Sequence, residues 1–493
     1  MRKRFEVQTT LGLTPLSDLL LPTTSRDELS PTLAGLQCIF LNPSLNEQIF
    51  ALVEEKIPAG LQNTKGRAGM SLWEILVLAV CRLTLDANYD RIHDLANHHS
   101  LIRHLMQVSS NSFTGENKSY GLQTIKDNLM LLDEATIMKI NELVVAHAHH
   151  LVLKKNEKLR IKSDTFVLET NIHFPTDYNL LWDSARKCLD ILDVCSRLYD
   201  FAGWRKLAAW RSELKNLSRA VGKASSFTHK NKERAIVQAA QDYVDKAKKL
   251  EKKISESVFE NWETIVQDIE LSTLIEKDLV FFLSMLTKHI DLVERRLIRK
   301  EVIASSEKIH SIFELHTEWI SKGKLNKAIE LGHNLLISTD QFGFILRSKV
   351  VEKQSDSQLV LALADDLLLR YTNKIERMSF DKGFYSQENK TLLSFAIEKV
   401  ILPKKGKRCA AQQAEESAKE FKKLRYAHSA IESNINQLEH HGLNRCPDKG
   451  FHRYKTYVSL GILSYNLCKL GKIILAKQAN ATPQASQVWQ QAA

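Results

Sequence analysis

The chain has 493 residues, enough for about three domains at roughly 150 residues each. Apolar residues make up 44% and charged residues 26%, a globular composition that excludes disorder over most of the length. With only 18 Gly and 9 Pro, long helices are favoured over an all-β or collagen-like fold. The seven cysteines include no CxxC pair. We therefore expect a reducing, cytoplasmic location, without a disulfide framework or a zinc site of the usual spacing.

The formal net charge is +11, and a basic surface attracts polyanions, so nucleic acid is the first partner to consider. The excess is concentrated between Gly203 and Lys253, which hold fourteen Lys and Arg against five Asp and Glu. Trp204 and Trp210 lie at the start of this segment. An ordinary solvated helical surface is an equally good interpretation of it, with both tryptophans in the core.

No secretion signal or membrane span is evident in the sequence. The basic Met1–Arg4 start is not followed by an apolar segment of signal-peptide length. The most apolar stretches, 72–85 and 458–476, contain charged residues and are shorter than the roughly 20 clean residues that a span requires. We predict a soluble protein without a membrane partner.

The first third of the chain is predicted to be helical. Residues 1–66 contain five of the nine prolines and are interpreted as a loosely helical arm. Ser71 and Glu74 form a capping-box pattern that predicts a helix running to about Leu85. Further helices are predicted over 91–97, 100–106 and 122–152. We interpret residues 67–155 as an all-α, helix-turn-helix-like domain, for which DNA contact and a purely structural or dimerising role both remain open. The histidine tract 147–150 does not favour a metal site, because adjacent helical histidines point in different directions.

The pattern then changes to an α/β core interrupted once. A strand is predicted over 159–169, followed by a long, charged, proline-free helical insertion over 182–305. Strands are then predicted at 309–320, 329–338, 344–352, 374–384 and 400–403. Helices are predicted at 356–373, 388–398 and from 410 to about 477. The core would comprise residues 156–181 and 306–475, and a polar tail, 476–493, is expected to be disordered.

Three carboxylates lie where this layout brings them together. Asp164 lies in the first strand, Asp381 lies at the end of a later strand, and Glu432 lies on a helix. Burying the apolar stripe beside Glu432 against a sheet would place this residue at the sheet's rim. Two divalent ions roughly 4 Å apart can activate an attacking oxygen and stabilise a leaving oxygen, and Mg²⁺ prefers carboxylate ligands. We predict that Asp164, Asp381 and Glu432 are catalytic and bind two Mg²⁺ or Mn²⁺ ions, with Asp164 bridging them. Taken singly, each has an ordinary alternative as a turn, edge or solvated residue.

Several basic residues are candidates for contact with a DNA backbone. Lys322 and Lys324 flank Gly323 in a predicted turn. The densest basic run in the core directly follows a predicted strand, and its members are Lys404, Lys405, Lys407 and Arg408. For this run, an ordinary solvated loop is the alternative. Glu169 is expected to be structural.

The motifs resemble those of bacterial insertion-sequence DDE transposases, of the loosely classified ISNCY-type group in the RNase H-like, retroviral-integrase superfamily. The resemblance rests on Ser163-Asp164-Thr165 with 169–177, on 380–385 and 428–433, and on 316–324, 441–446 and 466–471. It implies an enzyme that binds the terminal inverted repeats of its element, cleaves them to expose 3′-hydroxyls and joins these to target double-stranded DNA. It also implies the acidic triad, a homodimer or larger synaptic assembly, and a bacterial cytoplasm. No glycine-rich phosphate loop is present, so ATP is not expected as a cofactor.

One departure from the family concerns the residues around Glu432. Many relatives have Tyr, Arg and Lys seven before, four before and seven after the glutamate, and here these positions hold Arg425, His428 and Glu439. We predict that Arg425, and His428 when protonated, contact DNA phosphates, whereas Glu439 cannot replace a lysine. Two alternatives remain: a metal-dependent nuclease that does not join strands, and a non-catalytic DNA-binding protein derived from a transposase.

Overall fold

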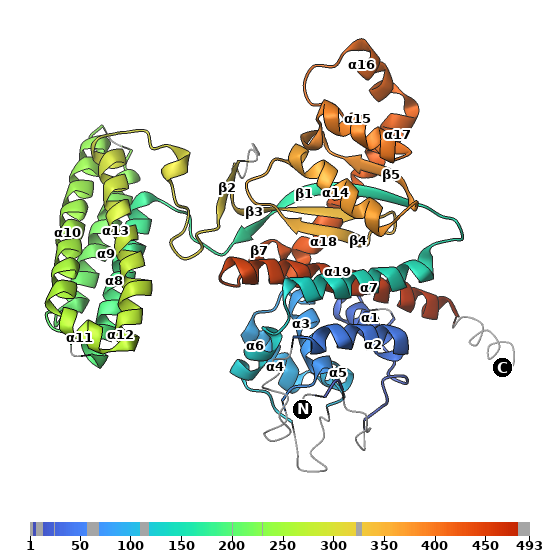
Figure 1. Cartoon of the computed structure of the whole chain (residues 1–493), viewed down its shortest axis with the longest axis horizontal. Coiled ribbons are helices and arrows are strands. Elements are labelled where there is room, and N and C mark those ends of the chain that lie inside the picture. Colours follow the sequence, from blue (N-terminus) through green and yellow to red (C-terminus); the bar gives the residue numbers. More distant parts are fainter. Residues whose placement is uncertain are drawn as a thin grey trace. The chain divides into compact units, whose positions relative to one another are not determined.

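The computed structural model describes residues 3–5, 13–23, 25–56, 69–108, 118–199, 201–228, 230–321 and 328–481. It is a mostly helical, mixed α/β protein built around one seven-stranded mixed sheet (Figure 1). The chain forms two compact units. We call residues 1–171 with 320–493 the sheet-bearing unit, and residues 172–319 the helical unit.

The sheet combines antiparallel and parallel pairing. Its strands are β1 (Leu159–Thr170), β2 (Glu318–Ser321), β3 (Ile329–Thr339), β4 (Ile345–Val350), β5 (Ile375–Phe380), β6 (Lys399–Ile401) and β7 (Arg445–Cys446). The order is β2-β3-β1-β5-β6, with β4 pairing with β3 and β7 with β1. β1 is antiparallel to β3 and parallel to β5, β3 is antiparallel to β4, and β5 is parallel to β6. The strand predicted over 159–169, the two strands around the 339–343 turn and the two later strands are thus confirmed.

Helices make up most of the remaining described residues in both units. In the sheet-bearing unit they are α1 (Leu29–Leu41), α2 (Pro43–Glu54), α3 (Leu72–Thr84), α4 (Tyr89–His98), α5 (Ser100–Leu105), α6 (Leu122–Leu129), α7 (Glu134–Val152), α14 (Asp356–Arg370), α15 (Gln387–Ala396), α16 (Ala410–Ser417), α17 (Lys419–His428), α18 (Ala430–Leu438) and α19 (Phe451–Ala481). Short helical turns are η6 (Lys382–Phe384) and η7 (Glu439–Leu443). The helical unit contains α8 (Asp177–Leu198), α9 (Leu207–Ser225), α10 (Lys232–Glu260), α11 (Trp262–Gln267), α12 (Ile269–Leu274), η3 (Ile275–Leu279), α13 (Val280–Val293), η4 (Glu294–Ile298) and η5 (Ser305–Glu307).

The predicted capping box at the start of α3 is confirmed. Ser71 Oγ accepts a hydrogen bond from the Glu74 amide, and the Glu74 carboxylate accepts one from the Ser71 amide, both at 3.2 Å. Every residue of α3 is buried. This helix therefore has no free face for a DNA groove, and DNA contact by the rest of the region 67–155 stays a prediction.

α19 is the central helix of the sheet-bearing unit. Figure 1 shows it between the sheet and the N-terminal helices, with α7 alongside. It is apolar enough to cross a membrane by length and composition, and it is the only such helix among the described residues. However, 78% of its most apolar window is buried inside the protein. A helix that is apolar all round is expected in a core as well as in a membrane.

The sequence suggested a loose N-terminal arm. The described residues of this segment are instead part of the core. α1 packs along α19, and Gly35 and Gly471 allow their backbones to touch. A Cβ atom on Gly471 would lie 1.6 Å from the carbonyl oxygen of Pro31, and one on Gly35 would lie 2.3 Å from that of Leu467. Only glycine fits such backbone contacts, and proline content alone did not reveal them.

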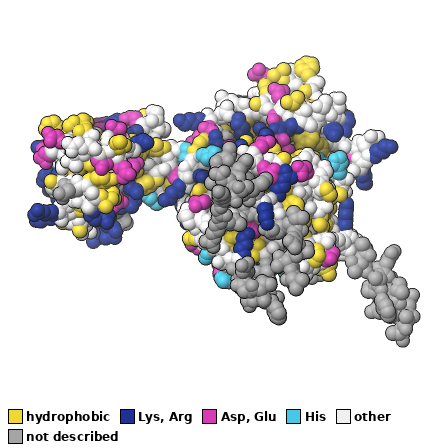
Figure 2. Space-filling view, turned by 60° about the horizontal axis from the view of Figure 1, so that its bottom comes forward, with side chains coloured by type: hydrophobic (Ala, Val, Ile, Leu, Met, Phe, Trp, Pro, Cys, Tyr) yellow, Lys and Arg dark blue, Asp and Glu magenta, His cyan; other side chains and the backbone are white. Residues whose placement is uncertain are grey.

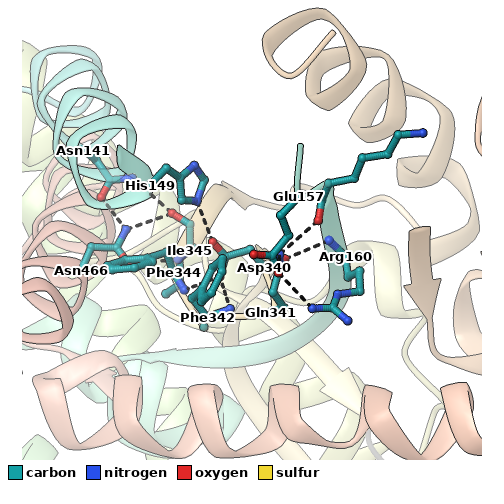
Figure 3. A network of polar contacts seen from close by, with 12 residues as sticks. Asn141, His149, Glu157, Arg160, Asp340, Gln341, Phe342, Phe344, Ile345 and Asn466 are labelled. Carbon is teal, nitrogen blue, oxygen red and sulfur yellow. Dashed lines mark hydrogen bonds and ion pairs between the residues drawn. The ribbon is translucent and has the colours of Figure 1, made fainter. Parts of the chain in front are cut away.

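The turn between β3 and β4 is fixed by buried polar groups (Figure 3). Asp340 is fully buried, and its Oδ1 accepts hydrogen bonds from the amides of Phe342 and Phe344 at 2.8 and 2.9 Å. Its Oδ2 lies 2.7 Å from Nε2 of His149, which is the role of this member of the histidine tract. Asn466 of α19 donates to the carbonyl of Ile345 and accepts from its amide, both at 2.9 Å.

The helical unit has its own hydrophobic core, which includes Trp204, 2% exposed. Its first helix begins at Asp177, five residues before the predicted insertion, because Thr176 Oγ1 caps it by accepting from the Asn179 amide. The strand predicted over 309–320 is wrong except at β2. Ser311 Oγ instead accepts from the amides of Phe313 and Glu314, which bends the chain into a turn.

The disordered tail was predicted to begin too early. Residues 476–481 continue α19, and residues 482–493 lie outside the described residues. All seven cysteines are free thiols, as their spacing indicated.

The close contact of α1 and α19 yields a test. Gly471→Ala should lower the free energy of unfolding by about 3 kcal/mol, because the new methyl collides with backbone that cannot rotate away. Gly222→Ala is the matched control, since its Cβ would meet only the Tyr178 side chain at an ordinary 3.5 Å. The control should be neutral or stabilising by up to about 1 kcal/mol. Urea denaturation followed by circular dichroism measures both, and equal effects would contradict the packing described.

Candidate active site

Two of the predicted carboxylates are register neighbours on the two central parallel strands. Lys162 of β1 is paired with Ser379 of β5, and Ser163 with Phe380. Continued by one residue beyond the last pair and the end of β5, this register sets Asp164 beside Asp381, and paired residues of parallel strands lie on the same face of a sheet. Asp164 is half-buried, and Asp381 is exposed where β5 ends. The carboxyl ends of parallel strands are where ligands bind in open α/β sheets.

The turn after β5 is held in place by aromatic packing. Phe380 and Phe384, on either side of Asp381, are 1% and 0% exposed, and their ring centroids are 5.5 Å apart. The amide of Phe384 donates to the carbonyl of Asp381 at 3.2 Å, closing the 3-10 turn η6. Because Phe380 and Phe384 are both buried, the backbone of Asp381 is held at the strand end. Its side chain stays accessible.

Asp356, at the start of α14, connects the surroundings of both aspartates, and sequence reasoning missed it. Its Oδ1 accepts from Thr165 Oγ1 at 3.1 Å, next to Asp164. Its Oδ2 lies so close to Gly383 that a Cβ there would approach it to 2.9 Å. A carboxylate in the first turn of a helix is an ordinary dipole contact, so the sequence offered no signal for this role.

Glu432 lies on α18, which follows closely on a residue that contacts β5. At the end of α17, Nδ1 of His428 lies 3.1 Å from Oγ of Ser379, the residue paired with Lys162. Glu432 lies one helical turn further on, exposed beside the fully buried Ile431, and α18 contacts β1. The apolar stripe predicted beside Glu432 is thus buried against the core, with Ile431 and Leu438 both 0% exposed.

The elements that bear the three carboxylates therefore lie together, but their side chains are not gathered into a finished metal site. Among the described residues, no group of three His, Cys, Asp or Glu side chains is positioned to hold one ion. The donor chemistry fits a hard cation, since all three predicted ligands are carboxylates. Metal binding by Asp164, Asp381 and Glu432 stays a prediction.

The surroundings of His428 disfavour the protonated form that its predicted phosphate contact requires. Burial lowers its pKa to about 4; the nearby charge of Asp381 opposes this, and that of Lys162 adds to it. Its Nε2 is buried without a hydrogen-bond partner. At pH 7 the ring is neutral, and it packs against the sheet through Ser379.

The basic run after β6 divides into two pairs. Lys404 Nζ donates to Gln412 at 2.8 Å, and Arg408 forms an ion pair with Glu416 at 2.9 Å. Lys405 and Lys407 are exposed on either side of Gly406, whose φ of +86° makes the loop tip. Lys404 and Arg408 thus attach the loop to α16, and Lys405 and Lys407 are the members available to a DNA backbone.

α17 offers a further basic surface near this loop. Arg425 is exposed, as its predicted role requires, and Lys422 and Lys423 beside it are exposed as well. These two lysines were not singled out from the sequence. Lys322 and Lys324 lie outside the described residues. On the face shown in Figure 2, Lys and Arg side chains are interspersed with Asp and Glu on both units rather than joined into one basic surface.

Comparison of the chain with protein-family models, with curated proteins and with solved structures yields no match.

The contacts of Asp356 predict a supporting role for this residue. Asp356→Ala removes the acceptor for Thr165 and the wall beside Gly383, so Asp164 and Asp381 lose a common anchor. We expect weaker binding of Mn²⁺, by about tenfold, the size typical for losing a partner of a metal ligand. Isothermal titration measures this affinity. Asp365→Ala, on the same helix, is the control and should bind as the wild type does.

The neutral state of His428 predicts a pH dependence. An unfolded chain has an ordinary histidine pKa near 6.5, so below this pH it binds more protons than the folded protein. Because the folded pKa is about 4, this residue should reduce stability as the pH falls from about 6.5 to about 4. Urea denaturation at pH 7 and pH 5 should show a smaller loss for His428→Gln than for the wild type. An NMR titration midpoint of His428 near 6.5 would contradict the assignment.

Proposed function

We propose that this chain is a DDE transposase-type enzyme, which cleaves DNA with divalent metal ions and joins the resulting 3′-hydroxyl ends to target DNA. The observation that carries the proposal is the register of β1 and β5, by which Asp164 and Asp381 become neighbours on one face. α18, which bears Glu432, contacts β1. These are the three residues that the resemblance to insertion-sequence transposases assigns to catalysis.

The topology of the sheet supports an RNase H-like core. Leaving aside the short β2 and β7, the strand order is β4-β3-β1-β5-β6. The first three strands are antiparallel and the last two run parallel to β1. This is the arrangement expected of an RNase H-like sheet, with one acidic residue in the first strand and another at the end of its parallel neighbour. A fold alone does not define an activity, so the carboxylates carry the argument.

The carboxylates would hold Mg²⁺ or Mn²⁺, with Asp164 and Asp381 as the fixed pair. When bound, two such ions supply activation of the attacking oxygen and neutralisation of charge on the leaving oxygen. Glu432, on an exposed first turn of α18, is free to change its rotamer toward the pair. The contact of His428 with Ser379 holds the end of α17, the helix that precedes α18, against β5 without adding charge.

The proposed chemistry is balanced without an energy source. In cleavage, a water oxygen forms a bond to phosphorus, the bond from phosphorus to the 3′-oxygen breaks, and this oxygen takes up a proton. In joining, that 3′-hydroxyl oxygen attacks a target phosphorus and displaces the target's own 3′-oxygen. Each step exchanges one phosphoester bond for another or for a hydrolysed end, so no nucleotide is consumed.

The partner is double-stranded DNA, both the terminal repeats and the target. Lys405, Lys407 and Arg425 are exposed cations near the ends of β5 and β6 and would contact its backbone. Joining two ends at one target implies a homodimer or larger assembly. These roles follow from the proposed reaction.

A strand-transfer assay tests the proposal. Duplexes taken from the DNA on either side of the coding sequence are incubated with the protein, Mn²⁺ and a supercoiled plasmid. We expect joined products, and a loss of at least about a hundredfold for Asp164→Asn, Asp381→Asn and Glu432→Gln, because each removes a metal-binding carboxylate. Glu439→Gln, on the same helical segment as Glu432, is the matched control and should retain activity.

The alternatives give different results in the same assay. Metal-dependent cleavage without joining identifies a nuclease. DNA binding without cleavage at any divalent ion identifies a non-catalytic binding protein, and activity that survives Asp164→Asn rules out the assigned site.

A further inference from the structure

The helical unit, which bears none of the three carboxylates, contains a pocket lined by cations and tryptophan. It has a volume of about 450 Å³, within the range of ligand sites. It lies where the chain enters α9, beside the C-terminal half of α10. Its lining residues are Gly203, Trp204, Arg205, Lys206, Trp210 and Lys253. Three of the six are cations and none is acidic.

Within the same basic segment some cations are held in ion pairs, whereas others, including the three that line the pocket, are not. Arg211, Lys246 and Lys248 are engaged in ion pairs with Asp190, Glu213 and Glu294, at 2.7, 2.5 and 2.6 Å. By contrast, no described carboxylate forms an ion pair with Arg205, Lys206 or Lys253. A solvated helical surface, the ordinary interpretation of this segment, does not require unpaired cations to converge on one pocket.

The pocket is built on a rigid floor. Trp204 is 2% exposed, and its indole Nε1 donates to Ser257 Oγ of α10 at 3.1 Å. The ammonium group of Lys253 lies 4.9 Å from the centre of the Trp204 ring, which orders this cation. Gly203, with φ of +95°, lies in the turn before α9, and Arg205 and Lys206 of the pocket lining follow it directly.

The start of α9 adds to the positive potential. Its first turn has no acidic residue, and no side chain caps it. Free backbone N–H groups at a helix start favour an anion. The pocket thus combines three unpaired cations with a helix start, and its volume accommodates more than one phosphate group.

We propose that this pocket binds the sugar-phosphate backbone of DNA, so that the helical unit is a second DNA-binding surface of the protein. Cations around a rigid aromatic floor suit a phosphate and its attached sugar, and they carry no base preference. The choice of DNA as the polyanion rests on the proposed function. The inference that the pocket binds an anion does not depend on that function. Binding here is independent of divalent ions.

The test measures the affinity of the full chain for a fluorescent 30-base-pair duplex in EDTA over a range of KCl concentrations. The pocket variant is Arg205→Gln/Lys206→Gln/Lys253→Gln. The control variant is Lys215→Gln/Lys223→Gln/Lys249→Gln, which removes the same charge from exposed positions of α9 and α10 outside the pocket. Thermal melting followed by circular dichroism checks that both variants are folded. If Lys253 is needed for folding, Arg205→Gln/Lys206→Gln replaces the triple pocket variant.

We expect the pocket variant to bind at least about tenfold more weakly and to lower the slope of log affinity against log salt by two to three, roughly 0.9 for each lost phosphate contact. The control variant should keep the wild-type slope. Equal losses in both variants, or no loss in the pocket variant, overturn the proposal. The assignment to DNA is overturned if inorganic phosphate raises the melting temperature of the wild type but not that of the pocket variant, while both proteins bind DNA with the same affinity.

The result is separable from the proposed catalysis. Asp164→Asn should abolish cleavage and leave this salt slope unchanged. If no cleavage is found at all but the pocket variant loses DNA affinity, the catalytic proposal fails and the DNA-binding pocket stands.

Discussion

The parallel pairing of β1 and β5 is the constraint on which the candidate site depends. With Lys162 opposite Ser379, Asp164 follows opposite Asp381. A slip of one residue would send one of the two carboxylates to the opposite face of the sheet. Several contacts resist such a slip. Ser379 Oγ donates to the carbonyl of Ile161 at 3.3 Å, and Ser163 Oγ lies 2.8 Å from Ser338 Oγ on the other neighbour. Small buried hydroxyls thus fix the register from both sides of β1.

α19 supports this arrangement from below the sheet. Several of its buried polar side chains bond to the backbone of other elements. Tyr454 donates to the carbonyl of Leu168 in β1 at 2.6 Å, and Ser464 donates to that of Val80 in α3 at 3.0 Å. Such groups are costly when buried alone and specific when paired. They explain why an apolar helix of this length can occupy one defined position in the core.

The sequence predicted the elements with strong local signals. The Ser71–Glu74 capping box, the alternation over 159–169 and the Asp340–Gly343 turn all act through neighbours within a few residues. The errors arose where distant contacts decide. The packing of α1 depends on Gly471, far along the chain, and the turn at Ser311 depends on a hydroxyl that competes with strand pairing. Within the candidate site, Asp356 was missed because its partner Thr165 lies 191 residues away. Burial of His428 likewise depends on β5, and it lowers the pKa of the ring, so the protonated form that its predicted phosphate contact needs is disfavoured.

The interruption of the sheet-bearing unit has a consequence for how the chain is made. β1 leaves the ribosome long before β3 and β5, because residues 172–319 are synthesised in between. At about 5–20 residues per second, β1 waits roughly ten seconds or more with both edges unpaired. The intervening segment has its own hydrophobic core, so it can condense during this interval and shorten the distance to be closed. α19 emerges last among the described elements. The core of the sheet-bearing unit therefore cannot close until the sheet and then α19 have been translated.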